Sequence, residues 1–423
     1  MNKILEDLKA RGMVSETFGP LEANLKQGEY VYCGCDPTSD SLGVHHLLAF
    51  MTLKRLKEFG MKPIVLIGGA SGSLGDPSYK DKERDAISME TVMHNCERIK
   101  KQLQKIVGED VVFVNNYDWI SKFSFLDFMR DIGKKITVNY MIAKDSVKSR
   151  LAKEGQGLSF CEFSYSNIQA YDFVHLYEQY GCKIQIGGRD QTGNIDSAFV
   201  LAHKRNKVDD LSAFVWSLLT TSDGKKFGKS EGNTIWLSSE KTSVYKFYQY
   251  FINLPDADVE DLMKKFTLIP LDEIEKMITK HRENPSSRYL QKELAKYMTC
   301  LVHSEEEYNK AVEASNILFG KGTTEQLATI DENALLAAMD GVYKVEVQKE
   351  NFVSGVSVVD VITMHDKVTS KSEARKLIKA NGFAINKSKV SNEKEVITES
   401  NLINGKYLLL QKGKKDYSLV IAS

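Results

Sequence analysis

Two lysines and a serine lie close together in a stretch that predicts a site for a polyphosphate. The stretch is Lys226-Phe227-Gly228-Lys229-Ser230, and it follows the turn residues Ser222-Asp223-Gly224. Lysine carries a compact charge on a flexible stem, so such a loop can place paired ammonium groups on phosphates whose charge changes during a reaction. The stretch is not a Walker A loop, because Gly224 and Gly228 enclose three positions where that pattern requires four. A solvated basic turn is the alternative interpretation of these residues alone.

Further polar residues follow two strand-like runs near the N-terminus. The run at 30–35 leads into Asp36-Pro37-Thr38 and then into His45-His46, at the head of a helical pattern that ends near Gly60. The unpaired N–H groups of a helix N-terminus attract phosphate, and two adjacent imidazoles could donate to phosphate or ribose. The run at 63–67 is followed by glycines that lack the G-x-G-x-x-G spacing, so a dinucleotide fingerprint is not met.

Short apolar runs alternate with helical patterns over the N-terminal half, and these elements must position the polar residues. Strands are predicted at 30–35, 63–68, 111–115 and 183–187, and helices at about 42–59, 88–107, 161–179 and 190–204. The alternation predicts an α/β fold with a doubly wound parallel sheet. Polar clusters at 34–38, 68–76 and 187–194 follow predicted strands. They should therefore meet at the carboxyl edge of the sheet, where ligands bind in this architecture.

The C-terminal half has a different pattern. Residues 241–319 show helical periodicity, and residues 320–350 lose it and are predicted to be a linker with partial structure. A final small unit begins near Val356, with a helix at 370–379 and short strands at 383–385, 407–410 and 418–421. From Asn351 to Ser423 there are twelve Lys/Arg against seven Asp/Glu, a net charge of +5. Any attraction to RNA should therefore be concentrated near the C-terminus.

The composition limits the classes of protein to which the chain can belong. The 423 residues suffice for two or three domains, and the 57 basic and 57 acidic residues cancel. The six cysteines show no paired C-x-x-C spacing, which is typical of reduced cytosolic thiols. We expect a cytoplasmic protein with no membrane partner, because neither a signal peptide nor an apolar run of about 20 residues is present.

Eight segments resemble, in order and spacing, the bacterial and organellar tyrosyl-tRNA synthetases. They are residues 32–38, 68–70, 75–78, 115–119, 163–165, 169–172, 185–191 and 226–230. The match covers nearly the whole chain, and the C-terminal unit resembles the RNA-binding module shared with a ribosomal protein of the S-four type. The resemblance implies a tyrosine-tRNA ligase that forms tyrosyl-adenylate and pyrophosphate from L-tyrosine and ATP. It would then transfer the tyrosyl group to the 3'-terminal adenosine of tRNA(Tyr).

The resemblance also implies the domain organisation. Residues 1–240 would form a Rossmann-like catalytic domain with a dimer-interface segment, and residues 241–320 a helical anticodon-side domain that binds tRNA. Residues 321–355 would be a linker region, and residues 356–423 an α+β RNA-binding domain of the S-four type. The enzyme would act as a homodimer. Mg²⁺ would arrive with ATP as a substrate complex, with no tightly bound cofactor and no metal site built by the protein.

The resemblance also implies individual residues of the site. Those implied for tyrosine are Tyr32 and Asp172 at its phenol, Asp76, Tyr165 and Gln169 at its ammonium group, and Gln191. Those implied for ATP are Cys33, Gly34, Asp36, His45, His46, Gly188, Asp190 and Lys229. Those implied for catalysis, mostly at the pyrophosphate, are Thr38, His46, Lys80, Arg84, Lys226, Lys229 and Ser230. Buried groups that pair with a substrate hydroxyl reject phenylalanine, because phenylalanine would leave them unpaired.

Four positions depart from the family pattern, all at the nucleotide end. The family's signature is His, an aliphatic residue, Gly and His, whereas this chain has Gly43-Val44-His45-His46. Arg189 replaces the usual small residue and Thr192 the usual bulky one. Three interpretations follow. They are an active synthetase whose pocket compensates, a weakened paralogue that binds RNA as a splicing or regulatory factor, and a P-loop hydrolase, which the loop spacing disfavours.

Overall fold

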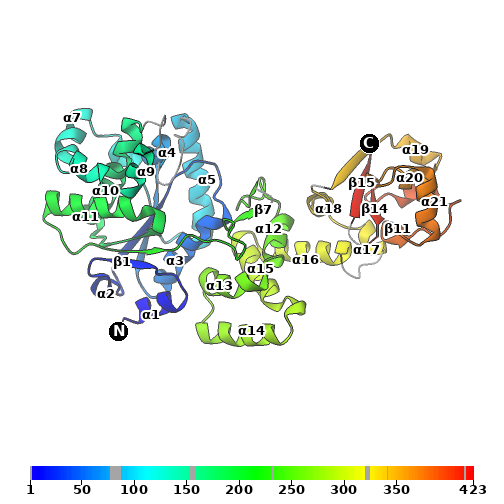
Figure 1. Cartoon of the computed structure of the whole chain (residues 1–423), viewed down its shortest axis with the longest axis horizontal. Coiled ribbons are helices and arrows are strands. Elements are labelled where there is room, and N and C mark those ends of the chain that lie inside the picture. The colour runs from blue at the N-terminus through cyan, green and yellow to red at the C-terminus, as the bar shows by residue number, and fades with distance from the viewer. Residues whose placement is uncertain are drawn as a thin grey trace. The chain divides into compact units, whose positions relative to one another are not determined.

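The chain forms two compact units. The computed structural model describes residues 2–76, 87–152, 158–230, 233–319, 324–340, 342–413 and 416–423. The first unit comprises Met1–Thr242 and Tyr250–Val302, and the second comprises Ser243–Gln249 and His303–Ser423 (Figure 1). The predicted catalytic residues that the structure describes all belong to the first unit.

A six-stranded sheet organises the first unit. Its order is β1 (Glu16–Phe18), β6 (Ser212–Trp216), β5 (Ile184–Gly188), β2 (Tyr30–Cys35), β3 (Lys62–Ile67) and β4 (Val112–Asn115). All neighbours pair in parallel except the edge strand β1, which is antiparallel to β6. The four predicted strands are confirmed to within a residue, whereas β1 and β6 were not predicted. In β3 every residue after Lys62 is buried, as expected for a strand covered on both faces.

Helices cover both faces of this sheet. The pair α3 (Leu47–Glu58) and α5 (Met89–Val107) packs together, as does the pair α10 (Phe160–Tyr180) and α11 (Thr192–Asn206) (Figure 1). From β2 the chain builds β3 and β4 on one side, and β5 and β6 lie on the other. The strand order therefore reverses between β2 and β5, which is where such sheets bind ligands.

The segments between the predicted helices form short helices that the sequence pattern did not indicate. The glycine-rich stretch after β3 forms α4 (Gly69–Leu74). The region after β4 forms α6 (Tyr117–Ile120), α7 (Phe125–Phe128), the π-helix η2 (Met129–Gly133), α8 (Val138–Ile142) and α9 (Asp145–Leu151). Each has too few turns for an apolar period to stand out.

The predicted helical region is confirmed. It contains α12 (Val244–Ile252), α13 (Asp256–Phe266), α14 (Leu271–Glu283), α15 (Tyr289–Val302) and α16 (Glu305–Phe319). Within the first unit, α13 packs on α3 and α15 packs on α5. In the second unit, the Tyr248 ring of α12 packs edge-on against Tyr308 of α16, with centroids 5.9 Å apart. Aromatic packing of this kind buries large apolar areas.

The second unit ends in a five-stranded sheet. Its order is β12 (Ser388–Lys389), β11 (Phe383–Ile385), β14 (Tyr407–Lys412), β15 (Asp416–Ala422) and β9 (Tyr343–Val347), with α21 (Lys371–Lys379) capped by Ser370. The sheet and helices share one apolar cluster that includes Phe352, Leu408 and Val420. Strand β9 lies inside the predicted linker region of 321–355 but pairs in parallel with β15. The sheet thus draws a strand from before the predicted boundary at residue 356.

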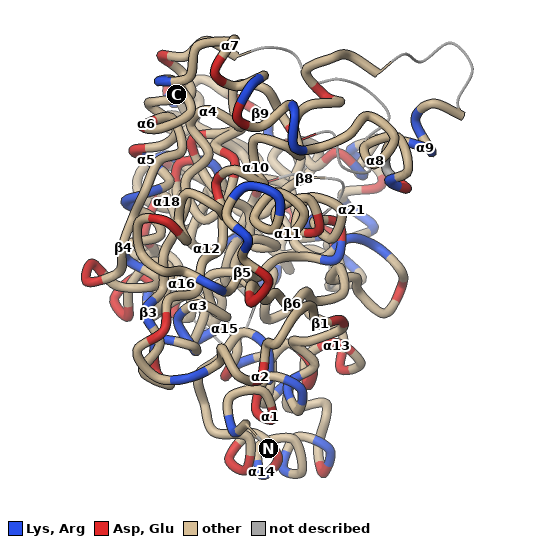
Figure 2. The backbone as a smooth tube through the Cα atoms, turned by 90° about the vertical axis from the view of Figure 1, so that its left-hand side faces the viewer, with Lys and Arg blue, Asp and Glu red and all other residues tan. Residues whose placement is uncertain are grey.

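The remaining elements of this unit are short. They are α17 (Thr324–Ala328), α18 (Glu332–Ala338), α19 (Glu350–Val353), β10 (Val356–Ser357), α20 (Val358–Ile362) and β13 (Val396–Ile397). Basic and acidic residues are interspersed along the backbone of the chain (Figure 2), as the balanced composition predicts. Among the described residues, no helix is both long enough and apolar enough to cross a bilayer.

Candidate active site

A buried carboxylate defines one end of the site. Asp172 lies on α10, which starts with a capping box at Ser159 and ends at Gly181 in the left-handed conformation. Its side chain is 2% exposed and accepts hydrogen bonds from Asn116 Nδ2 at 3.0 Å and Trp119 Nε1 at 2.8 Å. Burial raises the pKa of Asp172 to about 7, although the two donors lower it in part. This carboxyl group is therefore held in place but is costly to ionise.

Tyr32 on β2 supplies an unpaired hydroxyl beside that carboxylate. Within the described residues its hydroxyl is buried and has no hydrogen-bond partner, and its ring packs edge-on against Phe173 with centroids 5.1 Å apart. Burial, and then the charge of Asp172, raise the pKa of the Tyr32 phenol. A buried polar atom without a partner costs about 1–3 kcal/mol. The pair therefore suits a ligand whose own hydroxyl can bond to both groups.

A network of amides and carboxylates lies further along the same helix face. Tyr165 and Gln169 precede Asp172 by seven and three positions on α10. The Tyr165 hydroxyl donates to Asp36 Oδ2 at 2.7 Å. Gln169 Nε2 donates to Gln191 Oε1 at 3.2 Å, and Gln191 Nε2 lies 2.9 Å from Asp76 Oδ2 and from Asp190 Oδ2. Gln191 thus joins the carboxylates of Asp76 and Asp190 in one polar network, and a site with several carboxylates suits a cationic ammonium group.

Asp36 accepts a hydrogen bond from Tyr165, although the resemblance implied a role for Asp36 at ATP. Besides Tyr165, it accepts a hydrogen bond from Ser71 Oγ at 2.7 Å. Gly68 makes room for this pair, because a Cβ there would lie 2.3 Å from Asp36 Oδ1 and 2.2 Å from Ser71 Oγ. The structure therefore places Asp36 beside Tyr165, one of the residues implied for the ammonium group.

The sheet opens between β2 and β5 next to these residues. The two strands pair only at Val31↔Ile184 and Tyr32↔Gln185, so Cys33 and Gly34 lie beyond the paired residues. Burial raises the pKa of the Cys33 thiol to about 12, which keeps it a neutral group at physiological pH. On the other side Gly188 approaches Asp190 closely, since a Cβ there would lie 2.4 Å from Asp190 Oδ1. The residues implied for ribose thus flank the opening.

The Gly43-Val44-His45-His46 segment forms a 3-10 turn, η1 (Val44–His46), directly before α3. The rings of His45 and His46 lie together with centroids 4.0 Å apart, and His46 Nδ1 lies 3.2 Å from Gly43 N. His45 is exposed at the surface. The pKa of its imidazole lies below the ordinary value, because of partial removal from water and then the charges of Lys229 and Lys226. Both histidines therefore lie at the start of α3, as predicted.

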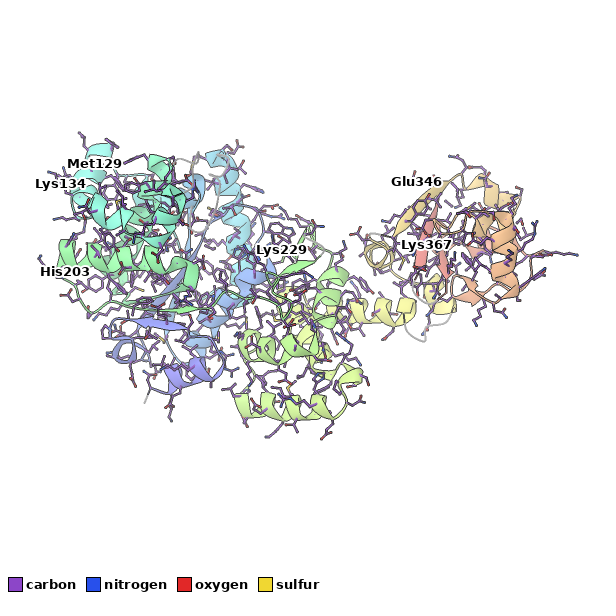
Figure 3. The ribbon with its side chains drawn as sticks, in the orientation of Figure 1. Met129, Lys134, His203, Lys229, Glu346 and Lys367 are labelled. Carbon is purple, nitrogen blue, oxygen red and sulfur yellow. The ribbon has the colours of Figure 1, made fainter. Side chains whose placement is uncertain are left out.

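The lysine loop is joined to this segment by the backbone. Its hairpin consists of β7 (Lys229–Ser230) and β8 (Asn233–Thr234). Val44 N donates to Ile235 O at 2.9 Å, and Ile235 N donates to Gly228 O at 2.9 Å. Phe227 is buried, whereas Lys226 and Lys229 are exposed (Lys229 is labelled in Figure 3). The two predicted phosphate sites, far apart in sequence, are therefore adjacent in space.

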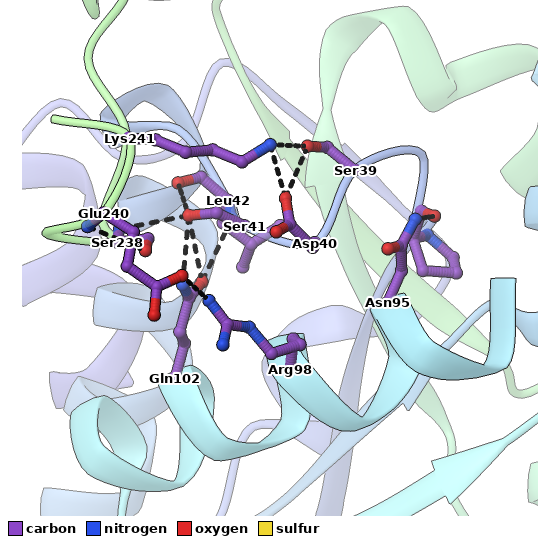
Figure 4. Close-up of polar contacts among 11 residues, drawn as sticks. Ser39, Asp40, Ser41, Leu42, Asn95, Arg98, Gln102, Ser238, Glu240 and Lys241 are labelled. Atoms are coloured by element: carbon purple, nitrogen blue, oxygen red, sulfur yellow. Dashed lines mark hydrogen bonds and ion pairs between the residues drawn. The ribbon is translucent and has the colours of Figure 1, made fainter. Parts of the chain in front are cut away.

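Side chains from three segments hold the loop that leads to Gly43 (Figure 4). Lys241 pairs with Asp40 and donates to Ser39 Oγ at 2.9 Å. Gln102 of α5 donates to Ser41 Oγ at 3.0 Å and accepts from Leu42 N at 3.1 Å. An ion pair between Arg98 and Glu240 closes the network. Thr38, at the start of this loop, is exposed.

A family model described as tRNA synthetases class I (W and Y) matches residues 26–320, and a model described as the tyrosine-tRNA ligase SYY-like C-terminal domain matches residues 335–420. The tyrosine-tRNA ligase of Bacteroides thetaiotaomicron is 48% identical over 427 residues, which cover 99% of each chain. The chain belongs to the tyrosine-tRNA ligase family. The ligase of Porphyromonas gingivalis (strain ATCC 33277) is 46% identical over 426 residues, again covering 99% of each chain.

A solved structure of the family is also similar. It is the C-terminally truncated mitochondrial tyrosyl-tRNA synthetase of Aspergillus nidulans, with a TM-score of 0.68 and 30% identity. The similarity covers 75% of this chain and 95% of that one. The six-stranded sheet and its helices are thus the class I synthetase fold, followed by a helical region and the C-terminal domain of tyrosine-tRNA ligases.

Some residues implied by the tyrosine-tRNA ligase pattern cannot be placed. Lys80 and Arg84 lie outside the described residues, as does the side chain of Ser230. Of the two departures after β5, Arg189 is exposed, and the Thr192 hydroxyl donates to Arg189 O at 2.8 Å. Where the chain is described, no group of three or more His, Cys, Asp or Glu residues could hold a metal ion.

Sequence reasoning missed the donors that hold Asp172. Asn116 and Trp119 belong to the segment 115–119 that carried the resemblance, but no role was assigned to them. Asn116 also connects Asp172 to the glycine-rich segment, because its Nδ2 donates to Ser71 Oγ at 3.0 Å and its Oδ1 accepts from Ala70 N at 2.8 Å. The available signal was the pair of asparagines, Asn115-Asn116, where a predicted strand ends at the carboxyl edge of the sheet.

Proposed function

We propose that this chain is a tyrosine-tRNA ligase. In the first step the carboxylate of L-tyrosine attacks the α-phosphate of ATP in line, giving tyrosyl-adenylate and pyrophosphate. In the second step a ribose hydroxyl of the terminal adenosine of tRNA(Tyr) takes the tyrosyl group and releases AMP. The full-length relatives named as tyrosine-tRNA ligases favour this enzyme over an RNA-binding paralogue.

The proposal rests on one observation, which is the buried hydroxyl of Tyr32 near the buried carboxylate of Asp172. A substrate phenol between them would donate to the Asp172 carboxylate and accept from the Tyr32 hydroxyl. Phenylalanine would enter the same space but offer no bond to the Tyr32 hydroxyl or to the remaining lone pairs of Asp172, at the cost of a buried unsatisfied polar atom. Asn116 and Trp119 would keep the carboxylate oriented for this bond.

The other end of tyrosine would meet the polar network. Asp76, Tyr165 and Gln169 would receive the ammonium group, with Asp36 adding charge through its bond to Tyr165. Gln191 would approach the carboxylate that becomes activated, because it already bridges Asp76 and Asp190. Fixing both ends of the amino acid places its carboxylate for attack, and positioning of this kind supplies much of the acceleration.

ATP would occupy the opening between β2 and β5 and extend towards the lysine hairpin. Cys33, Gly34, Gly188 and Asp190 would line the ribose. The list of groups proposed for the phosphates is Thr38, His45, His46, Lys80, Arg84, Lys226, Lys229 and Ser230. Charge builds up on the α-phosphate and on the leaving pyrophosphate, so cationic and N–H donors stabilise the transition state without an enzyme nucleophile. Mg²⁺ would enter with ATP, held mostly by phosphate oxygens and water.

The test is tyrosine-dependent exchange of pyrophosphate into ATP by the purified chain. We expect exchange that saturates with tyrosine and is far weaker with phenylalanine at equal concentration. Absence of exchange with every amino acid, from a chain that still binds tRNA, would contradict the enzyme and favour the RNA-binding alternative.

The rest of the chain is proposed to serve the tRNA. Residues 241–320 would contact the anticodon side, and residues 356–423 would bind RNA as a module of the S-four type after the region 321–355. Exposed Lys371 and Arg375 on α21 line a pocket of about 250 Å³ together with Lys394, and they form ion pairs there with Asp360 and Glu393. Lysine and arginine at such a surface would contact phosphates of the RNA backbone.

A homodimer is part of the same proposal. Large apolar side chains are exposed on consecutive elements from α7 to the start of α10. Helices α7 to α10 are labelled in Figure 1, and Met129 is labelled in Figure 3. The exposed side chains are Phe125, Leu126, Met129, Val138, Ile142, Leu151 and Phe160. Exposed apolar patches of this kind mark interaction surfaces, and a second copy of the chain would cover this one.

Light scattering tests the dimer. We expect twice the mass of 47.7 kDa for the wild-type chain and a monomer for Leu126→Asp or Phe160→Asp. A monomeric wild-type chain with full exchange activity would contradict this part of the proposal. We place the enzyme in the cytoplasm, where tRNA is charged, and its six free thiols suit a reducing compartment.

A further inference from the structure

The lysine turn, residues 219–228, is braced by its own backbone. Thr220 and Lys226 pair in an antiparallel bridge, and Thr221 N donates to Lys225 O at 2.8 Å. These bonds lie within the turn and would persist if the whole turn rotated. Contacts with the rest of the first unit must therefore decide where the lysines lie.

One aromatic side chain packs the lysine turn against the helical region. Phe227 is buried, and its ring lies edge-on against Tyr250 of α12 with centroids 5.6 Å apart. Its centroid also lies 5.4 Å from that of Phe266, at the end of α13. The packing of this ring fixes one residue of the turn, but the directions of its neighbours depend on other contacts.

Two hydrogen bonds to side chains hold the turn on either side of its tip. Ser222 N donates to Asp258 Oδ1 of α13 at 2.8 Å. Gly228 N donates to the hydroxyl of Tyr250 at 2.8 Å. Burial raises the pKa of Tyr250 to about 12, so this group stays a neutral hydroxyl at physiological pH. Together with the ring of Phe227, the two bonds fix the turn at three points, and three points define the orientation of a rigid body.

Asp258 is a poor source of stability in this position. Its other oxygen, Oδ2, is buried and has no hydrogen-bond partner among the described residues. A carboxylate oxygen that is removed from water without a partner costs free energy. A role in holding the lysine turn therefore accounts for a carboxylate at this position better than a role in folding does.

We infer that Tyr250 and Asp258 are positioning residues for the activation of tyrosine, because they hold the lysine turn in the orientation from which Lys226 can reach the phosphates of ATP. Lys229 follows directly after the bonded Gly228, so the same contacts set its position. The inference deepens the proposed function and rests on it. The helical region, which is proposed to contact the tRNA, then also serves the first chemical step.

Exchange kinetics test the role of Tyr250. Tyr250→Phe keeps the ring and removes the acceptor for Gly228 N. We expect kcat for pyrophosphate exchange to fall by about 3- to 10-fold, the factor for one neutral hydrogen bond. The dissociation constant for tyrosine should stay unchanged, because the lysines act on charge that develops in the transition state.

Tyr297→Phe on α15 is the matched control for Tyr250→Phe. Both side chains are half-buried, and the Tyr297 hydroxyl also accepts a backbone N–H, from Leu268 at 3.1 Å. The two variants lose the same kind of bond in the same helical region, but only Tyr250 contacts the lysine turn through its bond. Tyr297→Phe should therefore keep the wild-type kcat.

A conservative variant tests the role of Asp258. Asp258→Ala should lower kcat for exchange by about tenfold or more, because a hydrogen bond to a charged group is stronger than a neutral one. Asp258→Asn keeps an oxygen that can accept from Ser222 N, and we expect it to recover most of this loss. Recovery by the amide would identify the bond to Ser222, and not the packing of α13, as the cause.

Limited proteolysis with trypsin tests the positioning without any catalysis. Lys225 and Lys226 are exposed in the turn, and cleavage there depends on how often the turn opens. We expect cleavage after these lysines to become several-fold faster in Tyr250→Phe and in Asp258→Ala, and to stay at the wild-type rate in Tyr297→Phe. Mass spectrometry of the fragments identifies the cleaved bond.

Two outcomes would overturn the inference. One is a wild-type kcat in both Tyr250→Phe and Asp258→Ala, which would leave the proposed function intact. The other is an equal loss of kcat in Tyr297→Phe, which would indicate a general effect on folding. A wild-type chain that exchanges no pyrophosphate with any amino acid would instead contradict the proposed function, and the cleavage rates would still decide whether the two residues hold the turn.

Discussion

Asp172 is buried, accepts two hydrogen bonds and is proposed to select the substrate. Its two oxygens are held by Asn116 and Trp119, and the unpaired hydroxyl of Tyr32 lies beside it. Such an arrangement is a poor source of stability, because a buried carboxylate is expensive to ionise. Its benefit is recognition, since a ligand hydroxyl can bond to Asp172 and also to the Tyr32 hydroxyl, which has no partner among the described residues.

Asp172→Ala should weaken the choice of tyrosine far more than it weakens ATP binding. We expect the ratio of kcat/KM for tyrosine over phenylalanine to fall by about 10- to 100-fold, because a hydrogen bond to a charged group contributes about 1.5–3 kcal/mol. KM for ATP should change less than threefold. The measurement is pyrophosphate exchange with each amino acid. Unchanged rejection of phenylalanine would remove Asp172 from the phenol site.

Asp172 should also make the stability of the ligand-free protein depend on pH. Its pKa is 3.8 as an ordinary group and about 7 in the folded chain, so between these values the folded state binds the extra proton. The free energy of unfolding should therefore fall as pH rises through this window, by up to about 1.4 kcal/mol per pH unit. Denaturant unfolding of Asp172→Asn should lack this contribution. If the free energies of unfolding of the wild-type chain and of Asp172→Asn changed with pH in the same way, the result would contradict a raised pKa of Asp172.

The hairpin of β7 and β8 is the element that carries the lysines to the nucleotide end. The position of the hairpin depends on Gly228, which is left-handed and where a Cβ would lie 3.0 Å from His45 N. Gly224 in the same loop has a φ of +79°, and no described atom lies within 4 Å of a Cβ added there. The two glycines thus share a left-handed conformation but differ in the space around an added Cβ. They form a matched pair for mutation.

Gly228→Ala should lower kcat/KM for ATP by about tenfold or more, and Gly224→Ala should have little effect. Both substitutions cost about 1–2 kcal/mol of left-handed backbone, but only the first pushes the hairpin away from His45. Tyrosine affinity should be unchanged in both variants. Equal losses of kcat/KM for ATP in the two variants would mean that the left-handed backbone, and not the lack of space beside His45, causes the loss.

A buried ion pair joins α9 to the start of α10. Arg150 donates to both oxygens of Glu162, at 3.0 and 3.1 Å, and both side chains are nearly inaccessible to water. Glu162→Gln should lower the free energy of unfolding by about 3 kcal/mol, because it leaves a buried guanidinium without its counter-charge. Urea unfolding measures this loss. Glu313→Gln, on α16, is a control whose loss should be negligible, since surface charges contribute little.

The strength of local periodicity decided which elements could be predicted. The strands at 30–35 and 183–187 stand out as short apolar runs, and α5 stands out because its apolar residues keep the helical period. The helices α6 to α9 are too short to show a period. Strand β9 resembles a linker in sequence, since several of its residues face solvent, and only its pairing with β15 identifies it. Long-range pairing overrides local propensity in such cases.

At the scale of the whole molecule, activation and tRNA binding are proposed to reside in different parts of the chain. The residues proposed to bind tyrosine and ATP lie in the first unit, and the net charge of +5 lies in residues 351–423. A related mitochondrial synthetase was crystallised in a C-terminally truncated form. Removal of the C-terminal part should therefore separate the two steps.

A chain that ends at Phe319 should keep pyrophosphate exchange within about twofold of the full-length rate. Its charging of tRNA(Tyr) should fall at least about tenfold at moderate salt, because the lost lysines and arginines supply phosphate contacts. Keeping α16 preserves the packing of Tyr308 on Tyr248. Aminoacylation and exchange assays on one preparation measure both rates. Equal loss of both activities would argue against a separate RNA-binding module.

The sequence by itself determined the parallel-sheet architecture, the helical region and the residue types that gather at the carboxyl edge. Periodicity and residue spacing are properties of short stretches of chain, so no tertiary contact is needed to see them. Only the tertiary structure decided that the Tyr32 hydroxyl lacks a partner among the described residues, that Asn116 and Trp119 hold Asp172, and that the lysine hairpin bonds to the turn at Val44. The first two depend on atoms brought together from distant segments, and the third depends on how the lysine hairpin seats a turn of the backbone.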